Sequence, residues 1–219
     1  MLMEKARLDL VAYGKRMFRD GLVTLTSGNI SICDAESGLM AITPSGIPYE
    51  ETKPEDIVIM TLDGKIIEGF RKPSSEYALH AAVYLARKDA GAVVHTHSTY
   101  ATVLGITGEK LRAVHFLLAN MTGGCEVPLV PYFTYGTQEL AEGVKKAMAS
   151  CPACLLQNHG MVASGRDIEQ AYLTATVAEQ TAELQYRAEC IGTPRVLTEK
   201  EAEETYESYA RHYGQKQES

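Results

Sequence analysis

Tryptophan is absent from the sequence, aromatic residues of all kinds make up only 7%, and no second cysteine pair accompanies its single C-x-x-C. The five cysteines are spread along the chain, and Cys151 and Cys154 form that motif. A zinc site built from cysteines needs two such pairs, and a redox C-x-x-C belongs to a thioredoxin-like unit, which the surrounding residues do not resemble. We therefore interpret the cysteines as buried or surface thiols of a reducing cytosol, with a redox role or half of a zinc site as the alternative.

Long apolar runs and clusters of positive charge are also missing. No run approaches the ~20 apolar residues of a membrane span, and residues 1–20 lack the apolar core of a signal peptide. The net charge is −7, the isoelectric point is near 5.4, and the basic residues form no stripe. We therefore expect a cytoplasmic protein that binds neither nucleic acid nor membranes. A small anionic substrate is compatible with this charge, because a few well-placed donors can bind a phosphate inside an acidic protein.

The sequence predicts one domain, because no Gly-, Pro- or Ser-rich run marks a linker. Apolar periodicity predicts a helix over residues 4–20, whose inner side carries Ala6, Leu10, Val11, Met17 and Phe18. Short strands are expected at 29–33, 39–43, 57–61, 65–68, 92–96, 127–130, 153–157 and 160–163. Further helices are expected at 73–87, 99–104 and 138–149, and after the capping boxes at Asp167 and Thr198. We therefore predict that residues 1–219 form a three-layer α/β/α domain with a mixed, mostly antiparallel central sheet.

Three of the six histidines could form a metal site. His95 and His97 lie at the end of a predicted buried strand, where residues two apart point to the same side and can reach one ion. His159 lies at the turn between two short apolar strands. Three histidines suit Zn²⁺ and leave a fourth position open for catalysis. The alternative is three ordinary polar residues at strand ends, because spacing alone does not bring His159 to the other two.

The segment from Lys72 to Glu76 could bind an anion. Ser74 and Ser75 precede a predicted helix, whose free N–H groups and dipole favour negative charge. We expect one of these serines to be the N-cap, with Glu76 in the first turn, where it could reach a metal or a proton. On local sequence alone, a well-capped helix without further function is the simpler interpretation.

Two glycine-containing turns could complete a phosphate site. Gly28 and Asn29 follow Thr26-Ser27, and Ser45-Gly46 follow Thr43-Pro44. Such turns can form anion nests, although each is a common turn composition by itself. Neither matches the phosphate-binding loop of nucleotide hydrolases or the dinucleotide fingerprint.

The remaining titratable residues indicate less chemistry. We expect His80 to face out of its helix in a structural role, and His115 to be a satisfied core or interface residue. No G-x-S-x-G motif is present, and no lysine sits where Schiff-base chemistry is favoured.

These motifs occur in a fixed order: Thr26-Ser27-Gly28-Asn29, Thr43-Pro44-Ser45-Gly46, Pro73-Ser74-Ser75-Glu76, His95-Thr96-His97 and Asn158-His159-Gly160. Together they resemble the class II aldolase/adducin family, and within it the chain is most similar to the L-fuculose-1-phosphate aldolases. The resemblance runs from the first helix to the tail, so chance agreement of all five motifs is a poor explanation.

The resemblance implies a zinc-dependent aldolase of fucose metabolism. It would cleave a ketose 1-phosphate, L-fuculose 1-phosphate or a close analogue, to dihydroxyacetone phosphate and a small aldehyde such as lactaldehyde, by a retro-aldol step through a metal-stabilised enediolate. Glu76 matches the residue that ligates zinc in the empty site and acts as acid/base when substrate binds. The zinc ligands match His95, His97 and His159, and the phosphate site matches Gly28, Asn29, Ser45, Gly46, Ser74 and Ser75. Family members are usually homotetramers with active sites at subunit interfaces, which we expect here too.

The aldehyde end departs from the pattern of the fuculose-phosphate enzymes. Phe116 stands where they carry a tyrosine that donates a proton to the aldehyde oxygen, and phenylalanine cannot donate. Tyr135 stands where they carry phenylalanine, so we hypothesise that its hydroxyl takes over this role. Tyr213 matches a tail tyrosine that closes over the aldehyde. These positions leave the preferred aldehyde open.

Other interpretations remain. A 5-deoxyribulose or methylthioribulose 1-phosphate aldolase would differ only in its aldehyde. L-Ribulose-5-phosphate 4-epimerases use the same bond cleavage but carry aspartate where Glu76 stands, and methylthioribulose-1-phosphate dehydratases have their acid/base elsewhere. The adducin head domain has this fold without catalysis, and a three-histidine zinc hydrolase would fit if the phosphate site is misinterpreted.

Overall fold

A single mixed sheet organises the computed structural model, which describes residues 1–124 and 126–212. The described residues form eight strands in the order β4-β3-β2-β1-β5-β8-β7-β6. Every neighbouring pair is antiparallel except β6 and β7, so the predicted mixed, mostly antiparallel sheet is confirmed. The strands are β1 (Asn29–Asp34), β2 (Leu39–Ile42), β3 (Val58–Thr61), β4 (Ile66–Glu68), β5 (Ala92–Thr96), β6 (Leu129–Val130), β7 (Ala153–Leu156) and β8 (Gly160–Gly165).

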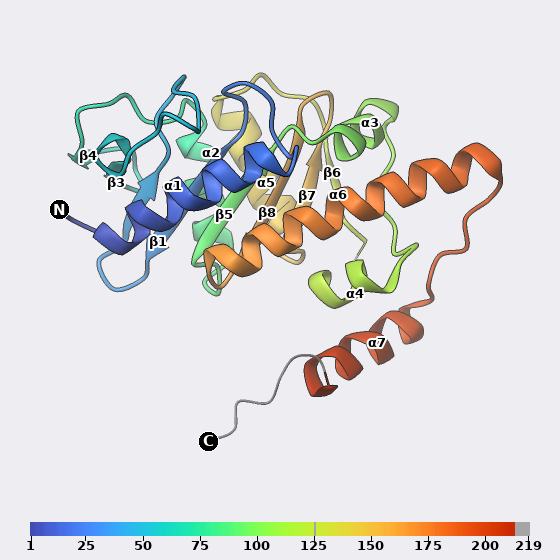
Figure 1. The fold of residues 1–219 in the computed structure, drawn as a ribbon. Helices are drawn as coiled ribbons and strands as arrows, with labels where there is room; N and C mark the ends of the chain where they lie inside the picture. The colour runs from blue at the N-terminus through green and yellow to red at the C-terminus, as the bar shows by residue number, and fades with distance from the viewer. Residues whose placement is uncertain (125, 213–219) are drawn as a thin grey trace.

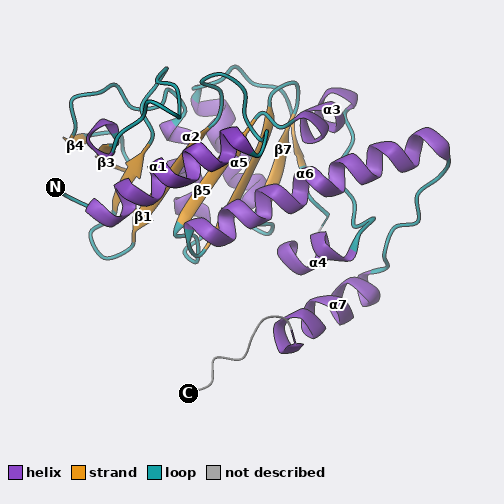
Figure 2. Cartoon of the chain, in the orientation of Figure 1, coloured by secondary structure: helices purple, strands orange, loops and turns teal. Residues whose placement is uncertain are grey.

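Helices cover both faces of the sheet (Figures 1 and 2). On one face lie α1 (Glu4–Arg19), α3 (Thr99–Thr107) and α6 (Ile168–Ile191), and on the other lie α2 (Tyr77–Ala86) and α5 (Gln138–Met148). Beyond the long helix α6, α4 (Phe116–Thr122) and α7 (Glu199–His212) pack against each other. A short 3₁₀ helix, η1, spans Pro54–Asp56. The three-layer α/β/α arrangement predicted from the sequence is therefore confirmed, whereas the assignment of residues 1–219 to one domain stays a prediction.

Strand β5 shows why the sheet needs cover on both sides. All five of its residues are buried, and their side chains alternate between two apolar cores. Val94 packs in the core below α1, α3 and α6, whereas Val93 packs in the core below α2 and α5. His95 therefore points to the same face as Val93, towards α2.

The first helix uses a slightly different face from the predicted one. Leu10 and Met17 are buried as expected, but Phe18 is 43% exposed. Arg7 is buried instead and donates hydrogen bonds to three backbone carbonyls, those of Leu2, Pro54 and Ile57, while its guanidinium also pairs with Glu68. These bonds tie α1 to the sheet edge formed by β3 and β4. Apolar periodicity could not reveal this role, because it treats arginine as a surface residue.

Helix α4 was not predicted, because its seven residues are too few for a periodic pattern. His115 is its N-cap, and its Nδ1 accepts the backbone N–H of Leu117. This agrees with a satisfied structural histidine. Among the described residues, no helix has both the length and the apolar composition required to cross a membrane.

Candidate metal centre and substrate cavity

The two histidines of the H-x-H motif lie at the end of the central strand β5. His95 is fully buried and pairs directly with Asn29 on β1, and His97 follows immediately after the strand. Gly28 precedes Asn29 with a φ of 71°, a left-handed conformation that suits glycine. A Cβ on Gly28 would lie 2.7 Å from the carbonyl oxygen of His95, so only glycine permits this approach of β1 to β5.

His159 reaches the same place from the turn between β7 and β8. Asn158 has a φ of 55°, and asparagine is one of the few residues other than glycine that enter this region readily. A Cβ on Gly160 would lie 2.1 Å from the carbonyl oxygen of Thr96, so the turn lies directly against the end of β5. In the Asn-His-Gly motif, Asn158 thus adopts the left-handed turn conformation and Gly160 allows close contact with β5, and together they place His159.

Glu76 enters from the opposite side, at the start of α2. It is itself the N-cap of that helix, so the prediction that Ser74 or Ser75 is the N-cap was wrong. The hydroxyl of Ser74 instead accepts the backbone N–H of Glu76 and fixes the turn before the helix. The Glu76 side chain is free to point at the sheet because it does not cap its own helix.

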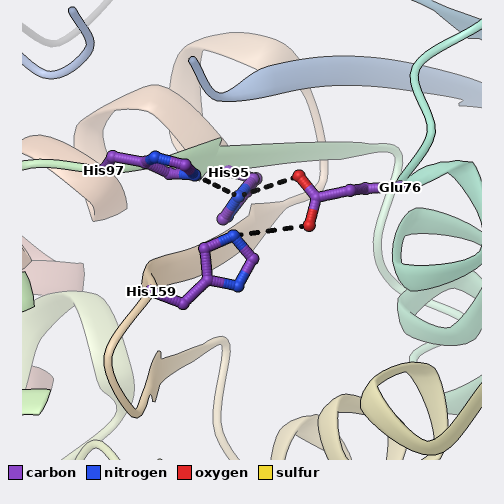
Figure 3. Close-up of side chains that lie close together, drawn as sticks. All are labelled: Glu76, His95, His97 and His159. Atoms are coloured by element: carbon purple, nitrogen blue, oxygen red, sulfur yellow. Dashed lines mark hydrogen bonds and ion pairs between the residues drawn. The ribbon is translucent and has the colours of Figure 1, made fainter. Parts of the chain in front are cut away.

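The four side chains converge on one point (Figure 3). Nε2 of His95 lies 3.1 Å from Nε2 of His97 and 3.2 Å from Oε2 of Glu76, and Nε2 of His159 lies 3.4 Å from Oε1 of Glu76. The ligand atoms all lie within 4.8 Å of one another. Four ligands bound tetrahedrally to one zinc ion at 2.0–2.1 Å would be about 3.3 Å apart. The spacing is therefore that of a metal site.

Two further observations show that the residues fit a cation. Oε1 of Glu76 is buried and has no hydrogen-bond partner among the described residues, which a bound metal would supply. Nδ1 of His95 donates to the carbonyl oxygen of Met161 at 2.9 Å, which leaves the Nε2 lone pair directed at the cluster. Facing lone pairs of neutral imidazoles repel each other unless a cation lies between them.

The protonation of the cluster also suits metal binding. Burial disfavours the charge of Glu76, but His95 and His159 outweigh it and hold the carboxyl pKa well below its usual range. Burial, together with the nearby His95, lowers the pKa of His97 to about 3 and that of His159 to about 4. Burial opposes the charge of His95, yet Glu76 raises its pKa. Near neutral pH, Glu76 is thus ionised while His97 and His159 are neutral, as metal ligands must be, and a bound metal would displace any proton that Glu76 holds on Nε2 of His95.

A cavity of about 340 Å³ opens beside the cluster, and it is lined by Glu76, His97 and His159. All six residues predicted for the phosphate site also line it: Gly28, Asn29, Ser45, Gly46, Ser74 and Ser75. Backbone hydrogen bonds hold their segments together, from Ser45 N to Lys72 O at 3.0 Å and from Ser74 N to Thr43 O at 3.1 Å. The structure therefore brings these residues to one site, while their contact with phosphate stays a prediction.

Aromatic side chains line another part of the same cavity. Tyr135 is among them, as the sequence hypothesis requires, and it is joined by Tyr132 and Phe133, which sequence reasoning missed. Only their position between two predicted site motifs could have indicated them. Phe116 lies on the surface at the start of α4, outside this cavity. Tyr213 lies outside the described residues.

His80 does not face out of its helix, and this expectation was wrong. It is fully buried between α2 and β1, where its Nδ1 lies 2.7 Å from Ser31 Oγ and its Nε2 lies 2.5 Å from Asn29 Oδ1. The Asn29 amide in turn donates to Oε2 of Glu76 at 3.0 Å. Apolar periodicity predicted that a histidine would lie on the outer face of α2. The prediction failed because α2 packs polar side chains, as well as apolar ones, against the sheet.

Comparison with known proteins identifies the family. Residues 8–186 match the class II aldolase and adducin N-terminal domain. The chain belongs to this family. The solved structure of an L-fuculose 1-phosphate aldolase superimposes with a TM-score of 0.92 at 40% identity, and the match covers 96% of this chain and 98% of that one.

Two curated relatives are aldolases of related sugar phosphates. A 5-deoxy-D-ribulose 1-phosphate aldolase of Bacillus thuringiensis serovar kurstaki is 47% identical over 93% of this chain and 94% of its own length. A 5-methylthioribulose-1-phosphate/5-deoxyribulose-1-phosphate aldolase of Rhodospirillum rubrum is 38% identical over 93% of this chain and 90% of its own. Class II aldolases depend on a metal, and the four-residue cluster is where this class II aldolase would hold it.

We expect the wild-type chain to bind one divalent metal ion, and His97→Ala to abolish tight binding. The substitution removes one nitrogen ligand and leaves the other three donors at an incomplete site. Metal content after dialysis, measured by mass spectrometry, tests this. His115→Ala is the matched control, since His115 lies outside the cluster. Equal metal content in the two variants would contradict the site.

Proposed function

We propose that the protein is an aldolase that cleaves 5-deoxyribulose 1-phosphate, or its 5-methylthio analogue, to dihydroxyacetone phosphate and a small aldehyde. The observation that carries the proposal is the Glu76 carboxylate, which faces three imidazoles at the side of a cavity lined with hydroxyl and backbone groups. The choice of substrate is supported by the 5-deoxy-D-ribulose 1-phosphate aldolase, which is 47% identical over 93% of this chain. The aromatic lining formed by Tyr132 and Phe133 suits a methyl or methylthio group better than a polyhydroxylated chain.

The reaction is a retro-aldol cleavage. Glu76 takes the proton of the C4 hydroxyl, C4 becomes the aldehyde carbon, and the electron pair of the C3–C4 bond passes to C2 and C3 as an enediolate. Protonated Glu76 then returns the proton to C3, which completes dihydroxyacetone phosphate. A divalent metal held by His95, His97 and His159 supplies Lewis-acid stabilisation of the negative charge that develops on the substrate oxygens. Three nitrogen ligands and one carboxylate favour Zn²⁺ for this role.

The phosphate is held by neutral groups. Neither lysine nor arginine is among the described residues that line the cavity. The hydroxyls of Ser45, Ser74 and Ser75, the backbone at Gly28 and Gly46, and the N-terminus of α2 provide the donors instead. The Asn29 amide lines the cavity too, although in this structure it contacts Glu76 and His80. An anion site of this kind fits a protein whose net charge is −7.

L-Fuculose 1-phosphate is the second candidate substrate. The structural match at a TM-score of 0.92 favours it, but Phe116 and Tyr135 depart from the pattern that the resemblance to the fuculose-phosphate aldolases implies at the aldehyde end. The expectation of fucose metabolism therefore gives way to the 5-deoxy sugar as first choice. A homotetramer with shared active sites, a role of Tyr213 over the aldehyde and a cytoplasmic location stay predictions. The four-residue cluster argues for an enzyme rather than a non-catalytic adducin-like domain.

Product analysis tests the proposed reaction. We expect the zinc-loaded protein to release dihydroxyacetone phosphate and acetaldehyde from 5-deoxyribulose 1-phosphate, with a higher kcat/KM than for L-fuculose 1-phosphate, and to lose this activity in EDTA. Coupled NADH oxidation measures the phosphate product, and mass spectrometry identifies the aldehyde. A faster reaction with L-fuculose 1-phosphate would reverse the order of the two candidates. An isomeric phosphate or loss of water would indicate an epimerase or a dehydratase.

Glu76→Gln should lower kcat by about 10²- to 10⁴-fold, because a neutral amide can neither accept nor return the proton. The three histidines remain, and the side-chain oxygen of glutamine can still take the fourth position, so bound zinc should be retained, and this is measured on the same sample. Glu139→Gln provides the control, since Glu139 is an exposed glutamate in the first turn of α5. A zinc-loaded Glu76→Gln enzyme with wild-type kcat would refute the assignment.

Tyr135→Phe should cost far more activity than Phe116→Tyr changes. Tyr135 lines the cavity with a hydroxyl that can hydrogen-bond the C4 oxygen as it becomes the aldehyde, and can protonate that oxygen in the reverse, aldol direction, whereas Phe116 has no hydroxyl to lose. Steady-state kinetics of both variants with the same substrate provide the comparison. If both substitutions have equal and negligible effects, the hypothesis that Tyr135 replaces the tyrosine missing at position 116 is wrong.

A further inference from the structure

A row of buried polar side chains leads from the interior of the protein to Glu76. Tyr84 Oη lies 2.7 Å from Ser31 Oγ, which lies 2.7 Å from His80 Nδ1. His80 Nε2 lies 2.5 Å from Asn29 Oδ1, and Asn29 Nδ2 donates to Glu76 Oε2 at 3.0 Å. All five residues are at most 6% exposed, so water does not substitute for these contacts.

Two regular elements place the row. Glu76, His80 and Tyr84 are spaced by four residues at the start of and along α2, so they form one stripe on the helix. Asn29 and Ser31 are two apart on β1, so they point to the same side of the sheet, towards that stripe. Side chains from α2 and β1 therefore alternate along the row.

The chemistry of Glu76 fixes the direction of every hydrogen bond. A carboxylate can only accept, so the Asn29 atom beside it is the amide nitrogen, and the amide oxygen faces His80. That oxygen needs a donor, so His80 carries its proton on Nε2. Nδ1 of His80 then accepts from Ser31, and Ser31 in turn accepts from Tyr84. Every proton in the row points towards Glu76.

Burial keeps His80 and Tyr84, the two ionisable residues behind Asn29, in the forms that this order requires. Burial lowers the pKa of His80 to about 3, so the ring is neutral and has one donor and one acceptor nitrogen. Burial also raises the pKa of Tyr84 well above its ordinary value, so its hydroxyl keeps the proton that begins the row. Aligned hydrogen bonds in a low-dielectric interior strengthen one another.

We infer that His80 is a positioning residue for the proton transfer: with Ser31 and Tyr84 behind it, it locks the Asn29 amide so that its nitrogen faces Glu76 and holds the carboxylate in place. The inference rests on the proposed role of Glu76 as acid/base. Without His80, the Asn29 amide can turn over and present its oxygen to the carboxylate, and Glu76 then loses its hydrogen bond. Asn29 and Glu76 line the cavity, whereas Ser31, His80 and Tyr84 lie behind them and are not among its lining residues.

A matched pair of serine substitutions separates this role from a general loss of stability. Ser31 and Ser164 are both buried strand serines, and Ser164 Oγ donates to the carbonyl of Pro152 at 3.1 Å, away from the row. Since Ser31 acts two contacts away from the carboxylate, we expect Ser31→Ala to lower kcat by roughly threefold to tenfold with little change in KM. Ser164→Ala should leave both constants unchanged. Equal kcat values for the two variants would overturn the inference.

Substitution of His80 gives the larger effect. His80→Phe keeps an aromatic ring but removes both hydrogen bonds, and we expect kcat to fall about 10- to 100-fold. His80→Gln keeps a donor for Asn29 and should recover a substantial part of the loss. If KM rises by the same factor as kcat falls, or if kcat of His80→Gln is no higher than that of His80→Phe, His80 has a purely structural role and the inference is overturned.

Crystal structures of the wild type and His80→Phe test the positioning without any activity. We expect Glu76 Oε2 and Asn29 to lose contact in the variant, and unchanged positions of both side chains would overturn the inference. If the wild type cleaves none of the sugar phosphates, the proposed function fails, and this structural comparison still decides the role of His80. If His80→Phe does not fold, Tyr84→Phe and Ser31→Ala, which each lose one hydroxyl, replace it in the same comparison.

Discussion

The burial of the Glu76 carboxylate is the constraint on which the rest of the site depends. An ionised carboxylate that is 6% exposed is costly unless positive charge and donors surround it. The structure provides one amide donor, from Asn29, and three imidazoles, and no described residue gives Oε1 a hydrogen bond. A cation bound between the carboxylate and the three imidazoles would offset this cost. The same arrangement that makes the carboxylate unfavourable by itself therefore suits these four residues to holding a metal ion.

The central strands meet that constraint through close backbone approach. Three segments distant in the sequence meet at the same point: the start of β1 at Asn29, the end of β5 near His95 and the β7–β8 turn at His159. Gly28 and Gly160 allow this close approach. A Cβ on Gly28 would collide with the carbonyl oxygen of His95, and a Cβ on Gly160 would collide with that of Thr96. The position of the candidate metal site is thus set by the end of a strand and by segments held directly against it, an arrangement that keeps the cluster well ordered.

The other side of Glu76 is held by the helix α2. Its polar stripe meets Asn29 and Ser31 of β1 inside an otherwise apolar layer formed by residues such as Val83 and Val93. Buried polar groups of this kind specify one arrangement of helix and strand, because any other register would leave them without partners. The fold and the orientation of the reactive carboxylate are therefore maintained by the same hydrogen bonds.

Local sequence patterns determined much of this protein. Period-two and period-3.6 patterns located the strands and most helices, and five ordered motifs indicated the family and the residues that the structure brings together in the four-residue cluster and around the cavity. These local patterns could not predict α4, the burial of Arg7 or the inward position of His80, because each depends on contacts with residues that are distant in the sequence. Only the tertiary structure brought His159 to His95 and His97, and only it joined Tyr84 to Glu76 through β1. The physical reason is that a sequence pattern specifies which face a residue takes within its own element, whereas the partner across that face is chosen when the elements pack.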